Sequence, residues 1–165
     1  MSSKTQLLKL AWLVVNLSFF RNFWHISDVL AVQHGGLSQQ GFIRSVSDAN
    51  LMFEFLLGGL KIDADNNVGI RDQEMASMRQ GRAFLTHLND NIPKTVPAME
   101  ELLVTLEGKD QSFSQPRFET LIFGIVYSAY QVQKQEAERE EAQQKAWADV
   151  LGRLANVTFI QLRSY

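Results

Sequence analysis

Apolar residues recur at helical spacing in several separate stretches of the chain after residue 46. A spacing of three or four residues places such side chains on one face of a helix, where they can pack against other helices. The predicted helices cover residues 47–60, 72–88, 97–107 and 116–145, with a final amphipathic stretch at 147–154. The pattern predicts an all-α fold, a compact bundle of four or five helices.

Residues suited to helix ends stand at the boundaries of these stretches. Ser47, Asp72 and Ser114 can each accept hydrogen bonds from the unpaired N–H groups of a first helical turn. Pro97 suits the first turn of the third helix, and Gly108 suits its end. We therefore expect these residues to mark the ends of the predicted helices.

The stretch at residues 118–130 is apolar on nearly all sides, which is typical of a helix at the centre of a bundle. Gly124 in its middle costs about 1 kcal/mol of helix propensity. We expect this glycine to permit the close approach of a neighbouring element. Residues 62–71 are a polar loop with a short extended piece at 68–70.

The first 31 residues have the pattern of a secretory leader. Lys4 and Lys9 form a basic start, residues 10–20 are mostly apolar, and the small-residue end at 29–31 matches a cleavage site. The apolar run is too short to span a bilayer, which needs about 20 residues. The pattern predicts a signal peptide removed after Ala31, a secreted and extracellular protein, and no stable membrane span in the mature chain.

This leader divides the chain into a signal peptide at 1–31, a flexible mature N-terminus at 32–46 and a single helical domain at 47–165. Two other interpretations of the first 31 residues remain open. They could stay attached as an anchor or interfacial helix, because Arg21, Trp24 and His25 suit a membrane surface. They could also form an ordinary helix of a cytosolic protein.

Composition narrows the possible functions. The 165-residue chain has a formal charge of −2, and removal of residues 1–31 would leave 13 basic and 17 acidic residues, a net charge of −4. No cluster of Lys and Arg is present outside the leader, so we expect no nucleic-acid partner. The chain has no cysteine, which excludes disulfides, thiol nucleophiles and cysteine-ligated zinc.

One segment resembles a calcium-binding loop. Counting from Asp63, carboxylates or amides stand at positions one, three, five and twelve of an EF-hand loop, namely Asp63, Asp65, Asn67 and Glu74. Position six, which needs a positive φ, is Val68, a β-branched residue for which that conformation is unfavourable. We therefore interpret the segment as a helix-connecting turn in which Asp72 caps the next helix, and expect no metal site.

Few other residues of the sequence suggest a catalytic or binding role. His87, with Asp90 and Glu74 nearby on the helix or just past it, is the one plausible base of the helical domain, but a single histidine near a helix end is usually solvated or interacts favourably with the helix dipole. No phosphate-binding glycine loop or nucleophile motif is present. We expect no catalytic residue, no cofactor and no enzymatic activity.

Two sequence triplets match the acceptor pattern for N-linked glycans. One, at residues 16–18, lies in the predicted leader. The other, at 156–158, places Asn156 nine residues from Trp147 and hence on the opposite side of a helix. Asn156 is therefore a possible glycosylation site if the protein is secreted.

Four strings in order, FEFLLG at residues 53–58, IRDQE at 70–74, IPKTVP at 92–97 and YSAY at 127–130, resemble the family with sequence similarity 180. The resemblance covers about residues 47–155. It implies a small protein with a predicted signal peptide in an uncharacterised family, and it supplies no catalytic residue, cofactor or partner.

These observations favour a secreted, non-catalytic helical protein that binds an extracellular protein partner. Two alternatives remain: an intracellular or membrane-docked scaffold with an uncleaved anchor, and a secreted enzyme with an unrecognised site. The surfaces least committed to packing are the loop at 92–97, which could also be only a rigid turn, and the polar face at 131–145.

Overall fold

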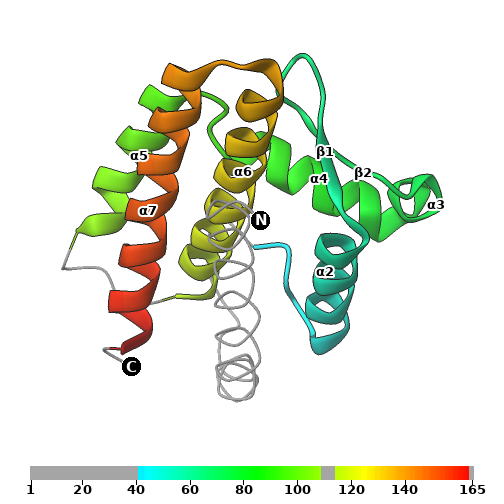
Figure 1. Ribbon diagram of the computed structural model, residues 1–165. Helices are drawn as coiled ribbons and strands as arrows, with labels where there is room; N and C mark the ends of the chain where they lie inside the picture. The colour runs from blue at the N-terminus through cyan, green and yellow to red at the C-terminus, as the bar shows by residue number, and fades with distance from the viewer. Residues whose placement is uncertain (1–40, 109–113, 164–165) are drawn as a thin grey trace.

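The computed structural model describes residues 41–108 and 114–163. This part of the chain contains six helices and one small two-stranded sheet (Figure 1). In chain order the elements are α2 (Val46–Gly58), β1 (Leu60–Ile62), β2 (Val68–Ile70), α3 (Gln73–Ser77), α4 (Arg79–Asn91), α5 (Val96–Glu107), α6 (Gln115–Glu138) and α7 (Glu141–Arg163). The predicted helical fold is confirmed. The predicted extended piece at 68–70 is β2, which pairs antiparallel with β1.

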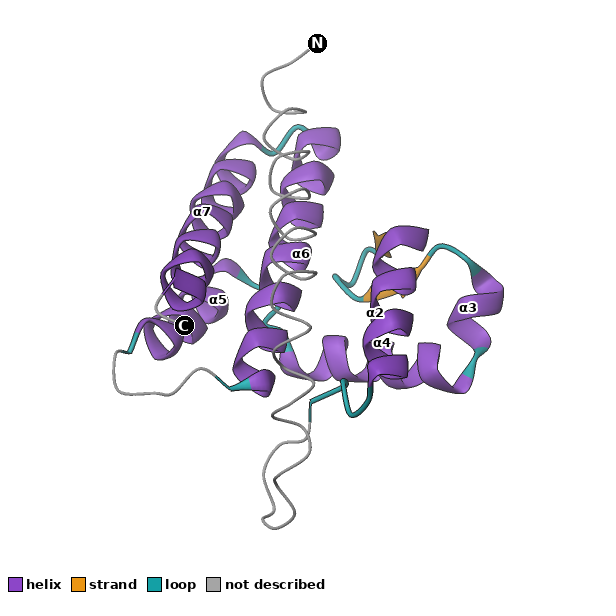
Figure 2. Ribbon diagram, turned by 90° about the horizontal axis from the view of Figure 1, so that it is seen from below, coloured by secondary structure: helices purple, strands orange, loops and turns teal. Residues whose placement is uncertain are grey.

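Helix α6 lies at the centre of the arrangement. It packs along α7, and α5 packs against α7 on the same side of the molecule (Figures 1 and 2). The hairpin and helices α2, α3 and α4 lie on the other side of α6 (Figure 2). The nearly all-round apolar stretch of α6 is thus explained, because this helix has packing partners on two sides.

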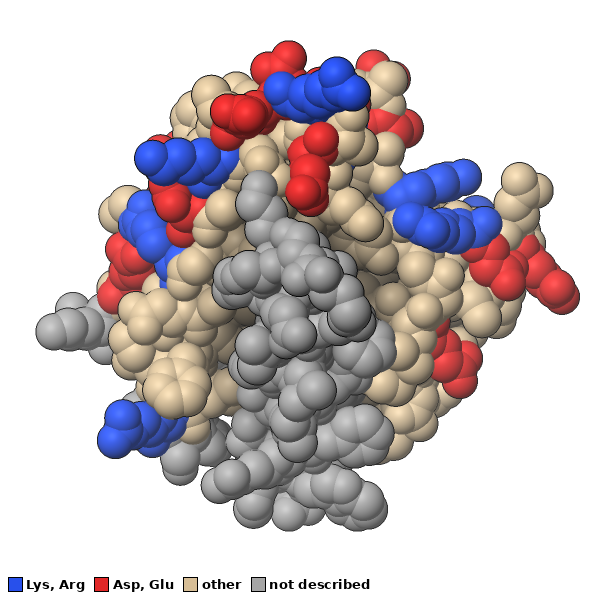
Figure 3. All heavy atoms as spheres, viewed as in Figure 1, with Lys and Arg blue, Asp and Glu red and all other residues tan. Residues whose placement is uncertain are grey.

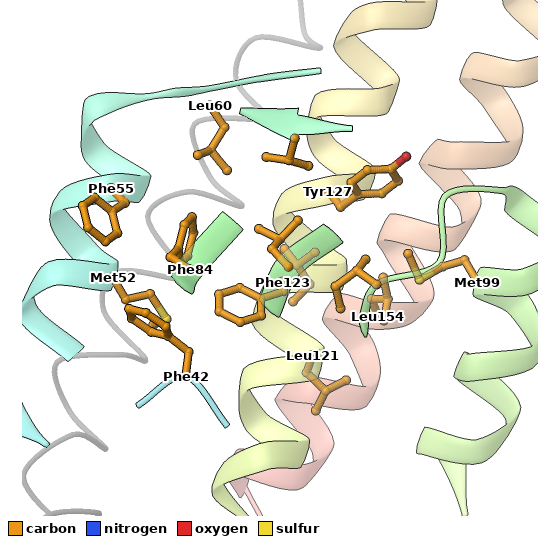
Figure 4. Close-up of a cluster of buried hydrophobic side chains, with 14 of the residues drawn as sticks. Phe42, Met52, Phe55, Leu60, Phe84, Met99, Leu121, Phe123, Tyr127 and Leu154 are labelled. Atoms are coloured by element: carbon orange, nitrogen blue, oxygen red, sulfur yellow. The ribbon is translucent and has the colours of Figure 1, made fainter. Parts of the chain in front are cut away.

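The core on the hairpin side is built around Phe84 of α4, which is fully buried. Its ring lies 5.5 Å from that of Phe42, 5.3 Å from Phe55 and 5.6 Å from Phe123, measured between ring centroids (Figure 4). Such distances are those of favourable aromatic pairs. One side chain thereby joins α2, α4, α6 and the segment that precedes α2.

Gly124 has the role expected from the sequence. A Cβ atom placed on this glycine would lie 3.3 Å from Cδ1 of Leu154 on α7, which is tighter than ordinary contact. The missing side chain therefore lets α6 and α7 approach closely. The helix ends predicted at Asp72, Gly108 and Ser114 are also observed, and Pro97 lies in the first turn of α5.

The predicted helix over 72–88 is interrupted. Met78 has extended backbone angles, and it separates the short helix α3 from α4. A Cβ atom on Gly81 would collide with the backbone oxygen of Met75. This glycine therefore allows the first turn of α4 to lie against the last turn of α3, an arrangement that helical periodicity alone does not reveal.

The predicted long helix over 116–145 is also two helices. Arg139 adopts a left-handed conformation with φ of 61° and ends α6, and Glu140 N–H then donates to the Gln135 carbonyl over 2.9 Å. Left-handed residues commonly end helices, but the position is usually Gly or Asn. The sequence has an arginine there, so the usual signal for this turn is missing.

The folded part of the chain begins before the expected boundary at residue 47. Ser45, two residues before the predicted Ser47, caps α2 by accepting a hydrogen bond from Asp48 N–H. Phe42 and Ile43 are buried in the core. Phe42 and Ile43 thus pack with the helices, whereas the predicted leader at 1–31 and the residues at 32–40 lie outside the described residues.

Candidate interaction surface

The loop between β1 and β2 is shaped by one aspartate. Oδ1 of Asp63 accepts the N–H groups of Asp65 over 2.9 Å and of Asn67 over 2.8 Å. Asn66 has a positive φ of 62°, a conformation that asparagine tolerates better than most residues. The hydrogen bond from the backbone of Asn67 lowers the pKa of Asp63, so the carboxylate form is favoured.

Two lysines from distant parts of the chain reach this loop. Lys94, in the loop before α5, donates to Oδ1 of Asn67. Lys134, on α6, donates to the Asp63 carbonyl over 2.9 Å and to Oδ1 of Asn66 over 3.0 Å. We call these five residues, Asp63, Asn66, Asn67, Lys94 and Lys134, the lysine–asparagine cluster. It joins the loop at 92–97 and the polar end of α6, which the sequence suggested as two separate surfaces.

Tyr127 contacts the backbone of the cluster from the core side. Its hydroxyl lies 3.2 Å from the Asn66 carbonyl and 3.4 Å from the Lys94 carbonyl, and it accepts a hydrogen bond from Gln131 over 2.8 Å. Burial raises the pKa of Tyr127, so the neutral hydroxyl is retained. Gln131 is itself buried and also donates to Asn66. The polar face expected at 131–145 therefore begins with a residue that supports the loop from inside.

Side chains of α4 and α6 fix the hairpin that carries the loop. The amide of Asn89 accepts from Val68 N–H over 2.8 Å and donates to Val68 C=O over 2.9 Å. Tyr130 OH accepts from Leu60 N–H over 3.0 Å. Both ends of the hairpin are thus attached to helices, which holds the cluster in one place relative to the core. Sequence reasoning identified neither contact.

The residues of the calcium-like pattern serve other purposes in this arrangement. The positive φ occurs at Asn66, and Val68 is in β2, where an EF-hand loop would need its turn. Glu74 lies in the first turn of α3, which Asp72 caps by accepting from the N–H groups of Glu74 and Met75. Among the described residues, no three His, Asp or Glu side chains form a group that could hold a metal ion. Lysine ammonium groups approach the loop instead.

A second polar centre lies inside the core, at Glu119 of α6. Only 1% of this residue is exposed. Its carboxylate accepts from Phe42 N–H over 2.6 Å, from Ile43 N–H over 3.1 Å and from Gln115 over 2.8 Å. Burial raises its pKa, and these hydrogen bonds oppose that shift. A charged residue within the otherwise apolar stretch at 118–130 was the available sequence signal.

His87 faces this carboxylate. Its Nε2 lies 3.7 Å from Oε2 of Glu119, and its ring contacts Phe123 at 5.8 Å between centroids. Burial lowers the pKa of His87, and the charge of Asp90 acts in the opposite direction. The sequence suggested Asp90 and Glu74 as neighbours, but the carboxylate that the fold brings within ion-pair distance is that of Glu119.

The possible acceptor Asn156 lies on the outward side of α7, as the helical wheel predicts. Asn156 is exposed, whereas Trp147 is buried. The third residue of the triplet, Thr158, is only 7% exposed, and its hydroxyl donates to the Leu154 carbonyl over 2.8 Å.

The surface carries charges of both signs. Basic and acidic side chains alternate on the face seen in Figure 3, without a large area of one sign. Within residues 41–108 and 114–163, no helix combines the length and the apolar character needed to cross a membrane.

Comparison with known proteins places these features in a family. A sequence model of the FAM180 family matches residues 29–161. The chain belongs to the FAM180 family. Human Protein FAM180B is 28% identical to it over 124 residues, which are 74% of this chain and 66% of the relative, just under two thirds. No solved structure matches the chain. The FAM180 region includes the lysine–asparagine cluster, Glu119 and Asn156.

Proposed function

We propose that this FAM180 protein is secreted and acts, without catalysis, by binding an extracellular protein partner through the lysine–asparagine cluster. The leader pattern of residues 1–31 supports export. The convergence of three separate segments in the cluster supports the choice of surface. Binding residues often lie on loops that a rigid scaffold positions, and this loop is attached to α4, to α6 and to the segment before α5.

The lysines of the cluster keep part of their bonding capacity. An ammonium group has three N–H donors, of which Lys94 uses one and Lys134 uses two within the described part of the chain. Neither lysine lies within ion-pair distance of a carboxylate there. The remaining donors can bind acceptor oxygens, so the contacting surface of the partner is expected to carry carboxylates at this point.

Preorganisation favours such an interaction. The lysine side chains are already held by hydrogen bonds to Asn66 and Asn67. Less side-chain entropy is lost when an ordered group binds than when a mobile group does. The cluster can therefore contribute to affinity although each of its hydrogen bonds is individually weak.

The test has two parts. First, the full chain with a C-terminal tag is expressed in animal cells, and the N-terminus of any protein in the medium is sequenced; we expect it to begin at Val32. Second, binding of the purified protein to cell surfaces is measured for the wild type, Lys94→Gln and Lys134→Gln. We expect each variant to weaken binding about tenfold, since a lost charged contact costs about 1.4 kcal/mol or more.

Arg163→Glu is the matched control, because this residue is at the far end of α7 (Figure 1). It should leave binding unchanged, and circular dichroism should show that all variants are folded. Retention of the protein in cells with Met1 intact would refute export. Binding that survives both lysine changes would refute the surface.

A further inference from the structure

An exposed apolar pair lies next to Asn156, the possible glycan acceptor on α7. Phe159 and Ile160 are 59% and 57% exposed. They follow Asn156 by three and four residues, which places all three side chains on one side of the helix. Single exposed apolar side chains are common on proteins, but two large ones side by side form a small apolar patch that an attached group can cover.

Helix geometry directs the pair toward Asn156. Side chains of an α-helix lean toward its N-terminus, so those of Phe159 and Ile160 extend over the turn that contains Asn156. On the helical wheel Phe159 lies about 60° to one side of Asn156 and Ile160 about 40° to the other. Viewed down the helix axis, a group attached to Asn156 would lie between the two apolar side chains, which start one turn closer to the C-terminus.

The turn before Asn156 leaves room for such a group. A Cβ atom on Gly152, four residues earlier, would meet no side chain beyond its chain neighbours, and no backbone of another element, within 4 Å. Arg153 is directed to the side, where it makes a bidentate ion pair with Glu107 of α5 at 3.0 and 3.2 Å. Among the described residues, the surface of α7 one turn before Asn156 is therefore open, and Phe159 and Ile160 form an apolar border one turn after it.

We propose that Asn156 carries an N-linked glycan whose first sugars cover Phe159 and Ile160. This inference rests on the secretion proposed above. The C–H-rich face of a pyranose ring can lie against an aromatic ring, while its hydroxyl groups remain in water. The attached glycan thus covers the apolar pair without another protein.

The buried hydroxyl of Thr158 determines whether glycan transfer comes before or after the packing of α7. The transfer enzyme reads the hydroxyl of the third residue, and here that hydroxyl donates to Leu154 inside the helix. Transfer to Asn156 therefore precedes the packing of α7. The folded, unglycosylated protein is not a substrate.

The test uses the full chain with Asn16→Gln, so that only Asn156 can be modified. It is expressed from its own N-terminus and, separately, behind an independent cleavable signal peptide. In the version behind the independent signal peptide, removal of N-glycans by an amidase should reduce the mass of the protein by one glycan, whether or not the other version is exported. Asn156→Gln should abolish this mass change. If the version with its own N-terminus stays in the cytosol while the version with the added signal peptide shows the mass change, the proposed secretion is refuted, but Asn156 is supported as a glycan acceptor. Exported protein without a shift overturns the inference.

Coverage of the pair is measured separately, with a fluorescent dye that binds exposed apolar surface. The amidase leaves aspartate at position 156, so Asn156→Asp is the unglycosylated reference. Fluorescence should be about twofold or more higher for this reference than for glycosylated protein. In a Phe159→Ser, Ile160→Ser background the glycan should make no difference. Equal fluorescence of glycosylated and unglycosylated protein would overturn the covering role.

Discussion

The backbone N–H of Phe42 donates to Oε2 of Glu119 over 2.6 Å, which joins two residues 77 positions apart. Ile43 N–H binds the other carboxylate oxygen. A Cβ atom on Gly41 would lie 2.5 Å from this carboxylate, so the glycine allows the backbone to approach it. The segment before α2 is thereby fixed to the central helix, and Phe42 is brought against Phe84.

Glu119→Ala should strongly destabilise the protein. It would leave the N–H groups of Phe42 and Ile43 buried without their acceptor, and each such loss costs about 1 to 3 kcal/mol. We expect a total loss of about 2 to 5 kcal/mol in the free energy of unfolding, measured by urea denaturation. The control is Glu107→Ala on the surface, where loss of the exposed ion pair with Arg153 should cost less than about 1 kcal/mol. Equal effects of the two changes would contradict the role of Glu119.

The stability that depends on Glu119 should fall as pH rises. Burial raises the pKa of this carboxyl above its ordinary value of 4.5 in the folded protein. A group with a raised folded pKa contributes fully below its unfolded value and loses that contribution as pH rises through the folded value. His87 acts in the opposite direction because its pKa is lowered, so the measurement is made in a His87→Gln background.

In that background, Glu119 and Glu119→Gln proteins are compared by urea denaturation from about pH 4.5 to about pH 7. The stability of the Glu119 protein relative to Gln should decrease across this interval. A difference that is constant with pH, or that increases, would show that burial does not control this carboxyl.

Local signals in the sequence predicted many of the helix ends but not the contacts between distant segments. Asp72 caps α3 through N–H groups two and three residues away, and Pro97 and Gly108 stand at the two ends of α5, so their roles can be inferred from sequence. Ser114 stands at the N-cap of α6 as predicted, but its side chain makes no capping hydrogen bond. Arg139 is different, because its left-handed conformation is unusual for the residue and is compatible here with the turn between α6 and α7.

At the candidate surface, too, local features could be inferred from the sequence, whereas contacts between distant segments could not. The loop at 92–97 and the polar end of α6 could each be recognised as surface segments. Their meeting at Asn66 and Asn67 depends on how the hairpin packs on α4 and α6, which periodicity does not specify. The contact of His87 with Glu119 likewise joins two helices whose relative position follows only from the fold.

Substitution of two glycines by alanine should have opposite effects. At Gly81 the new methyl group would collide with the backbone oxygen of Met75, which cannot move aside as a flexible side chain could. We expect a loss of about 2 kcal/mol or more. At Gly152, in an exposed and open position of α7, alanine should stabilise by about 0.5 to 1 kcal/mol through higher helix propensity. Thermal unfolding of both variants is the measurement, and stabilisation by Gly81→Ala would contradict the close packing of α3 against α4.

Asn89 should control the local stability of the hairpin. Its amide satisfies both the N–H and the C=O of Val68 on the side of β2 away from β1. Asn89→Asp keeps the acceptor for the N–H but replaces the donor to the carbonyl with an oxygen, which places two acceptors against each other. We expect a loss of about 1 to 3 kcal/mol, and faster hydrogen exchange at the amide of Val68.

The comparison for this change is Asn91→Asp on the same helix. Asn91 is exposed, and among the described residues its side chain bonds within α4, to His87. Its substitution should leave exchange at Val68 unchanged, because it touches neither strand. Because the lysine–asparagine cluster begins at the end of this hairpin, Asn89→Asp should also loosen the loop and weaken partner binding, whereas Asn91→Asp should not. Unchanged exchange at Val68 in Asn89→Asp would show that the hairpin is held by its other contacts, such as that of Leu60 with Tyr130.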